Sequence, residues 1–295
     1  MVEKRDYLMF KTLKELKSFL HRKINPVTEN KIEYYVMERF LKNKILFTAE
    51  HASTDEIVVK NKIGKEEIIF IGDKNTDLLA KLAANYLRSA YIFPLFERTR
   101  ADASRPPEDL GKGLRLFVKV FPKTGKGESK TSCLLIHKDK TYLPYLMEYH
   151  RLIDQLNPKA LVSIHGMSSK RKFDVLFGFG DDYLSIGGEK EAFRFKDEFI
   201  YFIDKVFSQM GIRNNLEIAV STWLFKGSKN YVLTKHIIDY NKKNKDKRIG
   251  MQVEFNWSGR VKDYQKDPVP TLTYQILVQA LGDFIFKWLY EKKNC

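Results

Sequence analysis

Two histidines and a glutamate lie at the ends of strand-like runs of sequence. His51 follows the apolar run 45–49, His165 ends the run 161–165, and Glu254 lies in a third run. In open α/β sheets, ligands and metals bind just beyond the carboxyl ends of the strands. Two imidazoles and a carboxylate gathered there are typical of a hydrolytic zinc site. The sequence therefore predicts a metal-dependent hydrolase.

The third metal ligand is not fixed by spacing. A hydrolytic zinc site usually takes three protein ligands and leaves one position for water. The segment between the two histidines offers several aspartates, and spacing does not choose among Asp55, Asp73, Asp77 and Asp102.

Glu254 has a different expected role, because a glutamate within hydrogen-bond reach of the attacking water can take its proton and pass it to the leaving amine. The alternative for Glu254 is an ion pair with Arg260 or a nearby lysine.

Arginines cluster around one aspartate in the segment that contains Arg98, Asp102 and Arg105. Guanidinium groups bind carboxylates through two parallel hydrogen bonds. The segment could therefore hold the carboxylate of a small anionic substrate. The alternative is a solvated loop in which the arginines pair with Asp102, Glu108 or Asp109.

The elements that must position these residues follow from the periodicity of apolar side chains. Apolar residues recur at helical spacing in 7–20 and 34–41, on either side of Asn25-Pro26, and predict an N-terminal helical extension over 1–44. From residue 45 to 295, strand-like and helix-like runs alternate, which predicts one α/β unit with helices on both faces of a sheet. The expected strands are 45–49, 67–71, 114–121, 160–164, 175–178, 216–220 and 251–255, and the expected helices are 78–86, 142–156, 191–210 and 271–290.

Composition limits the remaining possibilities. The net charge of +15 could indicate binding to nucleic acid, but basic residues occur along the whole chain, which favours a lysine-rich solvated surface. Two cysteines, Cys133 and Cys295, are too few for a disulfide framework or a cysteine zinc site. The longest uncharged apolar stretch, near 271–282, is shorter than the roughly 18 residues that a membrane span needs. We expect a cytoplasmic protein without a membrane partner.

Taken in order, several short motifs resemble those of the N-formylglutamate amidohydrolase family, which belongs to the zinc-carboxypeptidase-like superfamily. The resemblance covers about residues 45–260 and implies a mixed, mostly parallel sheet. The motifs are Phe47-Thr-Ala-Glu-His-Ala-Ser, Gly72-Asp-Lys-Asn-Thr-Asp-Leu-Leu-Ala, Arg98-Thr-Arg-Ala-Asp-Ala-Ser-Arg-Pro-Pro, Tyr149-His150, Leu161-Val-Ser-Ile-His-Gly, Phe173-Asp-Val-Leu-Phe-Gly, Phe225-Lys-Gly-Ser and Gln252-Val-Glu-Phe-Asn.

The resemblance also implies roles for individual residues. One zinc ion per chain would be held by His51, His165 and an acid, for which Asp73 is the first choice and Asp77 the reserve. Glu254 would be the catalytic acid and base of an amide hydrolase. The remaining catalytic-site residues that the resemblance implies are Arg98, Arg105 and His150.

The chain departs from the family pattern at several places. Ser163 stands where an aspartate is common, and Ser104 stands where an asparagine precedes Arg105. The N-terminal helices and the lysine-rich segment 241–248 lie outside the pattern. These departures leave the acyl group and the amine open, and the oligomeric state is not specified by the sequence. A peptidase or deacylase of the same superfamily, or a basic nucleic-acid-binding protein on this scaffold without catalysis, remains an alternative.

Overall fold

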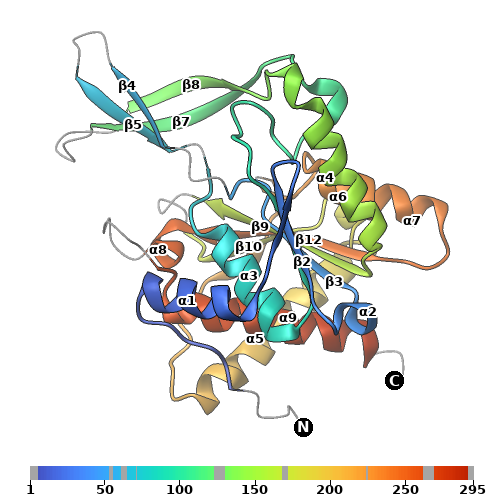
Figure 1. The fold of residues 1–295 in the computed structure, drawn as a ribbon. Helices are drawn as coiled ribbons and strands as arrows, with labels where there is room; N and C mark the ends of the chain where they lie inside the picture. The colour runs from blue at the N-terminus through green and yellow to red at the C-terminus, as the bar shows by residue number, and fades with distance from the viewer. Residues whose placement is uncertain are drawn as a thin grey trace.

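The body of the protein is built on a mixed eight-stranded sheet (Figure 1). The computed structural model describes residues 6–52, 56–60, 65–70, 72–122, 130–167, 172–223, 225–261 and 269–291. In spatial order the strands of this sheet are β1 (Val27–Glu29), β2 (Ile32–Val36), β6 (Ala90–Pro94), β3 (Ile45–Thr48), β9 (Ala160–Met167), β12 (Ile249–Asn256), β10 (Val175–Gly178) and β11 (Ile218–Val220). The four central strands β6, β3, β9 and β12 are parallel to one another, and the outer pairs β2–β6 and β12–β10 are antiparallel, which confirms the predicted mixed, mostly parallel α/β fold class.

Helices cover both faces of this sheet (Figure 1). One face is covered by α1 (Leu13–Lys23), α3 (Thr76–Leu87), α5 (Glu189–Gln209) and α9 (Leu272–Tyr290). The other face is covered by α4 (Leu143–Leu156), α6 (Tyr231–Leu233) and the π-helical turn Thr234–Ile238, which continues into α7 (Asp239–Lys243). The remaining short elements are α2 (Phe40–Asn43), α8 (Trp257–Arg260) and the 3₁₀ turns Pro107–Asp109, Lys140–Tyr142 and Asp181–Tyr183.

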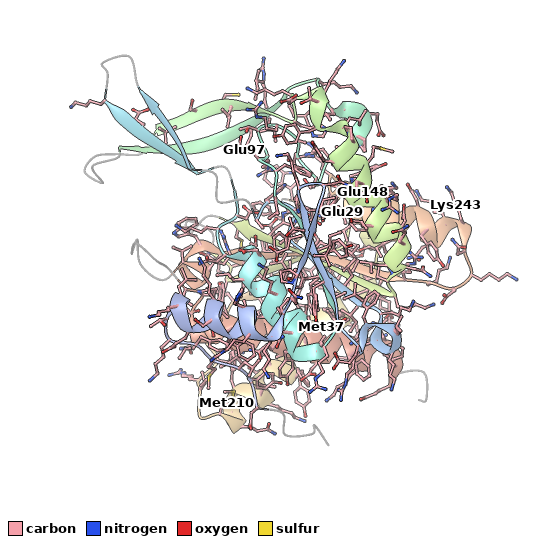
Figure 2. The ribbon with its side chains drawn as sticks, viewed as in Figure 1. Glu29, Met37, Glu97, Glu148, Met210 and Lys243 are labelled. Carbon is pink, nitrogen blue, oxygen red and sulfur yellow. The ribbon has the colours of Figure 1, made fainter. Side chains whose placement is uncertain are left out.

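Burial on both faces explains why the central strands are apolar along their length. Phe47 and Val162 pack into the core on one face, whereas Leu46 and Leu161, their neighbours in sequence, pack into the core on the other. Parallel strands covered on both sides have near-continuous apolar runs. Side chains fill the space between the sheet and its helices, and Lys243, within the basic segment 241–248, lies at the outer edge of the molecule (Figure 2).

A second, four-stranded antiparallel sheet projects from the body (Figure 1). Its strands, in spatial order, are β4 (Glu56–Lys60), β5 (Glu66–Phe70), β7 (Leu114–Pro122) and β8 (Lys130–Ile136). The strands predicted at 67–71 and 114–121 are therefore confirmed as strands, although residue 71 lies outside the described residues. The pattern of their side chains did not indicate that they form a sheet of their own.

The N-terminal residues differ from their prediction. Helix α1 forms as expected and begins with a capping box, in which Thr12 and Glu15 satisfy each other's backbone amides. The helix predicted over 34–41 is wrong, because β1 and β2 form a hairpin there and β2 pairs with β6 of the main sheet. The positive φ angles of Asn30 (49°) and Lys31 (59°) suit a two-residue hairpin turn. Only Phe40–Asn43 is helical in this segment, and β6 was not predicted.

No helix among the described residues is both long enough and apolar enough to cross a bilayer.

Candidate metal centre

Three adjacent parallel strands bring the predicted chemical groups to one edge of the sheet. In the register of β3 and β9, Thr48 lies beside Ser163, so both chains reach their histidines just beyond this point. In the register of β9 and β12, His165 lies directly beside Glu254. Residues at the same register of parallel neighbours lie on the same face of a sheet. His51, His165 and Glu254 therefore meet at the edge that the sequence indicated.

His51, His165 and Asp73 form a compact triangle of candidate ligand atoms. The Nδ1 atoms of the two histidines are 3.1 Å apart. Asp73 Oδ2 lies 3.3 Å from Nδ1 of His51 and 3.5 Å from Nδ1 of His165. Ligands about 2.0–2.1 Å from a tetrahedral zinc ion are about 3.3 Å apart, so the triangle has the size of one face of such a tetrahedron. The donor set and its spacing therefore fit Zn²⁺.

Backbone contacts hold Asp73 in this position. Its N–H donates to the carbonyl of His51 at 2.6 Å, and its carboxylate accepts a hydrogen bond from the N–H of Gly166 at 2.9 Å. The reserve candidate Asp77 lies one turn farther along, on α3, and lines a separate cavity beside Lys81. The structure therefore brings Asp73, and not Asp77, to the histidines, while Asp55 lies outside the described residues.

Each histidine is oriented by a carboxylate on its other nitrogen. His51 Nε2 lies 2.9 Å from Oδ1 of Asp102, and His165 Nε2 lies 3.0 Å from Oε2 of Glu50. A carboxylate on the far nitrogen of a metal-binding histidine fixes the tautomer and the ring orientation. Both imidazoles therefore present Nδ1 to the centre of the triangle. The role of Glu50 was not predicted, because it follows from a contact with the histidine of another strand.

Serine hydroxyls complete these two carboxylate–histidine contacts. Ser163 Oγ donates to Glu50 at 2.7 Å and lies 2.9 Å from Nε2 of His165. Ser104 Oγ donates to Asp102 at 2.7 Å and lies 3.0 Å from Nε2 of His51. Ser163 stands where the motif that it resembles has an aspartate, and in this chain the carboxylate that contacts His165 comes from Glu50 instead.

The charges around the triangle favour a cation. Burial alone would lower the pKa of His165, but hydrogen bonds to Asp73 and Glu50 outweigh it and raise this pKa to about 10. Burial opposes ionisation of Asp73, yet hydrogen bonds with both histidines hold its pKa well below the usual value. His165 therefore lies between two carboxylates that favour a positive charge at its position, where a divalent cation would also be favoured.

Glu254 lies beside the triangle and is only 3% exposed. Its Oε1 accepts a hydrogen bond from Gln252 Nε2 at 2.6 Å, while its buried Oε2 has no hydrogen-bond partner among the described residues. Burial raises the pKa of Glu254; His165 opposes this shift, and the negative charge of Asp73 adds to it. Asn230 orients Gln252 by donating to its Oε1 at 3.0 Å. A carboxylate with a raised pKa and an unused oxygen is suited to exchange protons with a bound molecule.

The triangle and Glu254 open into a pocket of about 740 Å³. Arg98 and Arg105 line this pocket, and Trp223, 78% exposed, also lines it. Arg98 Nε donates to Oδ2 of Asp102 at 2.9 Å. Arg105 Nη1 donates to the carbonyl of Lys229 at 3.3 Å, and its buried Nε has no hydrogen-bond partner among the described residues. Arg98 is thus hydrogen bonded to Asp102, whereas Arg105 Nε lies 3.9 Å from the same carboxylate oxygen, and Arg105 keeps hydrogen-bond donors for the pocket.

His150 is not brought to this site. It lies on the buried face of α4, and its Nδ1 is 3.1 Å from Nε2 of His236. His236 Nδ1 is in turn 2.7 Å from Asp154. Because this face of α4 packs against the π-helical turn, His150 is not among the residues that line the pocket. The role that the motif Tyr149-His150 implied is therefore not supported by its position.

The comparisons with known proteins bear on the fold. No protein-family model matches the sequence, and no curated protein matches it. The gene product Atu2144 of Agrobacterium tumefaciens is structurally similar, with a TM-score of 0.50, 12% identity, and coverage of 90% of this chain and 96% of the other. N-formylglutamate amidohydrolase from Ralstonia eutropha JMP134 has a TM-score of 0.53 and 11% identity, with 90% of this chain and 100% of the other covered. The chain therefore has the fold of N-formylglutamate amidohydrolase, as its motifs implied.

Proposed function

We propose that this protein is a zinc-dependent hydrolase that cleaves the amide bond of a small anionic N-acyl amino acid. The observation that carries the proposal is the triangle of His51, Asp73 and His165, in which each imidazole is oriented by a carboxylate and Glu254 lies alongside with an unused oxygen. The fold shared with N-formylglutamate amidohydrolase supports it.

The residues of the triangle would hold the ion through the two Nδ1 atoms and a carboxylate oxygen. Bound zinc would polarise the scissile carbonyl and lower the pKa of a water molecule to about 7. With zinc bound, Asp102 and Glu50 would each accept a hydrogen bond from Nε2 and so favour the tautomer that leaves Nδ1 free for the ion.

Glu254 carries the proton. Its Oε2, which has no hydrogen-bond partner among the described residues, accepts the proton of the attacking water. The same oxygen then donates this proton to the leaving nitrogen. Because burial raises the pKa of Glu254, the protonated form is less costly than for an exposed glutamate, which suits a group that must act as base and then as acid.

Arg105 binds the anionic group of the substrate. It lines the pocket, and its buried Nε has no hydrogen-bond partner among the described residues, although it lies 3.9 Å from Oδ2 of Asp102. Arg98, which is hydrogen bonded to Asp102 and also lines the pocket, adds a second positive charge. A pocket of about 740 Å³ leaves room for acyl groups larger than formyl.

Metal analysis and a substrate screen test the proposal together. We expect about one zinc per chain, and turnover of at least one member of a panel of N-acyl amino acids that varies in acyl group and side chain. His51→Ala and His165→Ala should lose both metal and activity, while His21→Ala, a substitution on the surface of α1, should retain both. Absence of zinc combined with salt-sensitive nucleic-acid binding would contradict the proposal and favour the basic binding protein.

A further inference from the structure

Arg260, the last residue of α8, is only 2% exposed and contacts the backbone of the segments that carry the metal-centre residues. Its guanidinium donates to three backbone carbonyls: Nε to Phe255 at 3.0 Å, Nη1 to Lys74 at 2.6 Å and Nη2 to Met167 at 3.4 Å. These carbonyls belong to the end of β12, the loop before α3 and the end of β9.

Each of these three segments carries one group of the site. Phe255 directly follows Glu254, Lys74 directly follows Asp73, and Met167 comes two residues after His165. A single planar group therefore joins the backbones that deliver the proton carrier and two of the three candidate ligands. A guanidinium is suited to this task because its donors have fixed directions.

Gly166 provides the space for this contact. A Cβ atom at Gly166 would lie 2.2 Å from Cζ of Arg260, a distance that no real side chain tolerates. The guanidinium thus lies directly against the backbone next to His165. The N–H of Gly166 donates to Asp73, so the same residue links Arg260 to the metal triangle. Asn75 adds a reciprocal contact by donating to the carbonyl of Arg260 at 2.8 Å.

Packing alone does not account for an arginine at this position. A buried cation is costly unless it is hydrogen bonded and faces negative charge, and an apolar side chain would fill the same space without that cost. The carboxylates of Asp73 and Glu254 are close enough to Arg260 to interact with its charge. The residue is therefore placed where both its donors and its charge act on the site.

We propose that Arg260 is a positioning residue that sets the separation of Asp73, His165 and Glu254 by joining their backbones. The inference rests on the proposed function, because it assumes that these groups bind the metal and move the proton. It concerns the geometry of the chain behind the site and not a contact with substrate.

The test compares Arg260→Lys and Arg260→Met with Arg248→Met. Arg248 is a matched control: it is also buried, donates to the carbonyl of His236 and stacks on Tyr240, away from the metal centre. The readouts are zinc affinity by competition with a chromophoric chelator, amide hydrogen exchange of the peptide that contains Gly166, and kcat and KM separately.

Both Arg260 variants should bind zinc about 10- to 100-fold more weakly, the usual effect of removing a group that orients metal ligands. Exchange at Gly166 should be faster in the metal-free protein, and kcat should fall more than KM rises. Lysine keeps the charge but cannot span three carbonyls, so it should not rescue. Arg248→Met should lower the unfolding temperature without changing zinc affinity. Zinc affinity within twofold of wild type in both Arg260 variants, or full rescue by lysine, would overturn the inference.

A double-mutant cycle adds a measurement that does not depend on either variant alone. Gly166→Ala should weaken zinc binding in the wild-type background, where its methyl group would meet the guanidinium, but much less in an Arg260→Ala background, where that space is vacant. Additive effects would contradict the inference. If wild-type protein binds no zinc, the proposed function fails, while hydrogen exchange at Gly166 still reports whether Arg260 holds these segments together.

Discussion

Replacing Glu254 by glutamine would exchange one oxygen atom of the site for an NH₂ group. The amide oxygen can take the place of Oε1 and accept the hydrogen bond from Gln252, which is 2.6 Å long in the wild type. The NH₂ group then occupies the place of Oε2, which has no hydrogen-bond partner among the described residues. Because that atom is unpaired in both proteins, we expect the free energy of unfolding to change by no more than about 1 kcal/mol.

The effect on catalysis should be far larger, because glutamine cannot accept the proton of the attacking water. General acid–base catalysis contributes about 10²- to 10⁴-fold. The variant should therefore lose about 2.7–5.4 kcal/mol of transition-state stabilisation, at 1.36 kcal/mol for each factor of ten. Zinc content should remain near that of the wild type, since Glu254 is not a ligand in the proposed site.

The assay measures zinc content, urea unfolding and kcat on the same preparations, first with the best substrate of the screen. Glu148→Gln is a matched control, because Glu148 lies on α4 and pairs with Arg151. Loss of zinc from the Glu254 variant would show that Glu254 is a ligand and that the acidic ligand must be reassigned. Full activity of the variant would refute the assignment of the proton carrier.

Three further predictions concern the ligand, the substrate and pH. Asp73→Ala should abolish tight zinc binding whereas Asp77→Ala should leave it near wild type, as measured by chelator competition; the opposite order would reverse the choice of ligand. Arg105→Gln should retain zinc but lower kcat/KM by about 10- to 150-fold, the loss of a charge-assisted hydrogen bond of about 1.5–3 kcal/mol, and an amidated substrate turned over as fast as the free acid would argue against a carboxylate contact. Burial, together with the positive charge of neighbouring groups, holds the pKa of His150 well below its usual value. Below about pH 6.5 the unfolded chain therefore binds a proton that the folded protein does not, and the free energy of unfolding decreases as the pH is lowered. His150→Phe should reduce that fall between pH 7 and 5.5 in urea unfolding, and an unchanged slope would show that His150 titrates normally in the folded state.

The sequence predicted the parts of the site that depend on local pattern. Buried parallel strands are apolar throughout, so the runs before His51 and His165 were visible as strands, and the ends of such strands define where polar groups meet. The choice of Asp73 over Asp77 came from the motif resemblance, and the structure brings Asp73 to the histidines.

The sequence did not predict groups that act across the fold. Glu50 is adjacent to His51 in sequence, but its partner is His165. No local pattern in the sequence indicates this contact, because it forms only when the two strands pair. Asn230 and Arg260 lie far from the candidate ligands in sequence, and no regular spacing of residues links them to the site. Conversely, His150 matched a motif, but the packing of α4 directs it to His236.

The hairpin predicted as helix shows the same limit in the backbone. Tyr34 and Tyr35 have a spacing to later apolar residues that suits a helix. They form a strand instead, because the turn at Asn30 and Lys31 allows a hairpin and β6 offers backbone hydrogen bonds to its second strand. Periodicity alone cannot weigh the hydrogen bonds that a neighbouring strand offers.

The four-stranded sheet has a consequence for the metal centre, because β4 and β5 lie in the chain between His51 and Asp73. The segment from His51 to Asp73 is closed at its base by the hydrogen bond from the N–H of Asp73 to the carbonyl of His51. An ion bound by both side chains would be a second link across the base of this loop, as a crosslink is. Closing a loop costs entropy that grows only slowly with its length, so the hairpin can lengthen or shorten with little effect on the two ligands at its base. The metal centre can therefore stay the same while β4 and β5 vary in length, although the chain that joins His51 to Asp73 also forms these two strands.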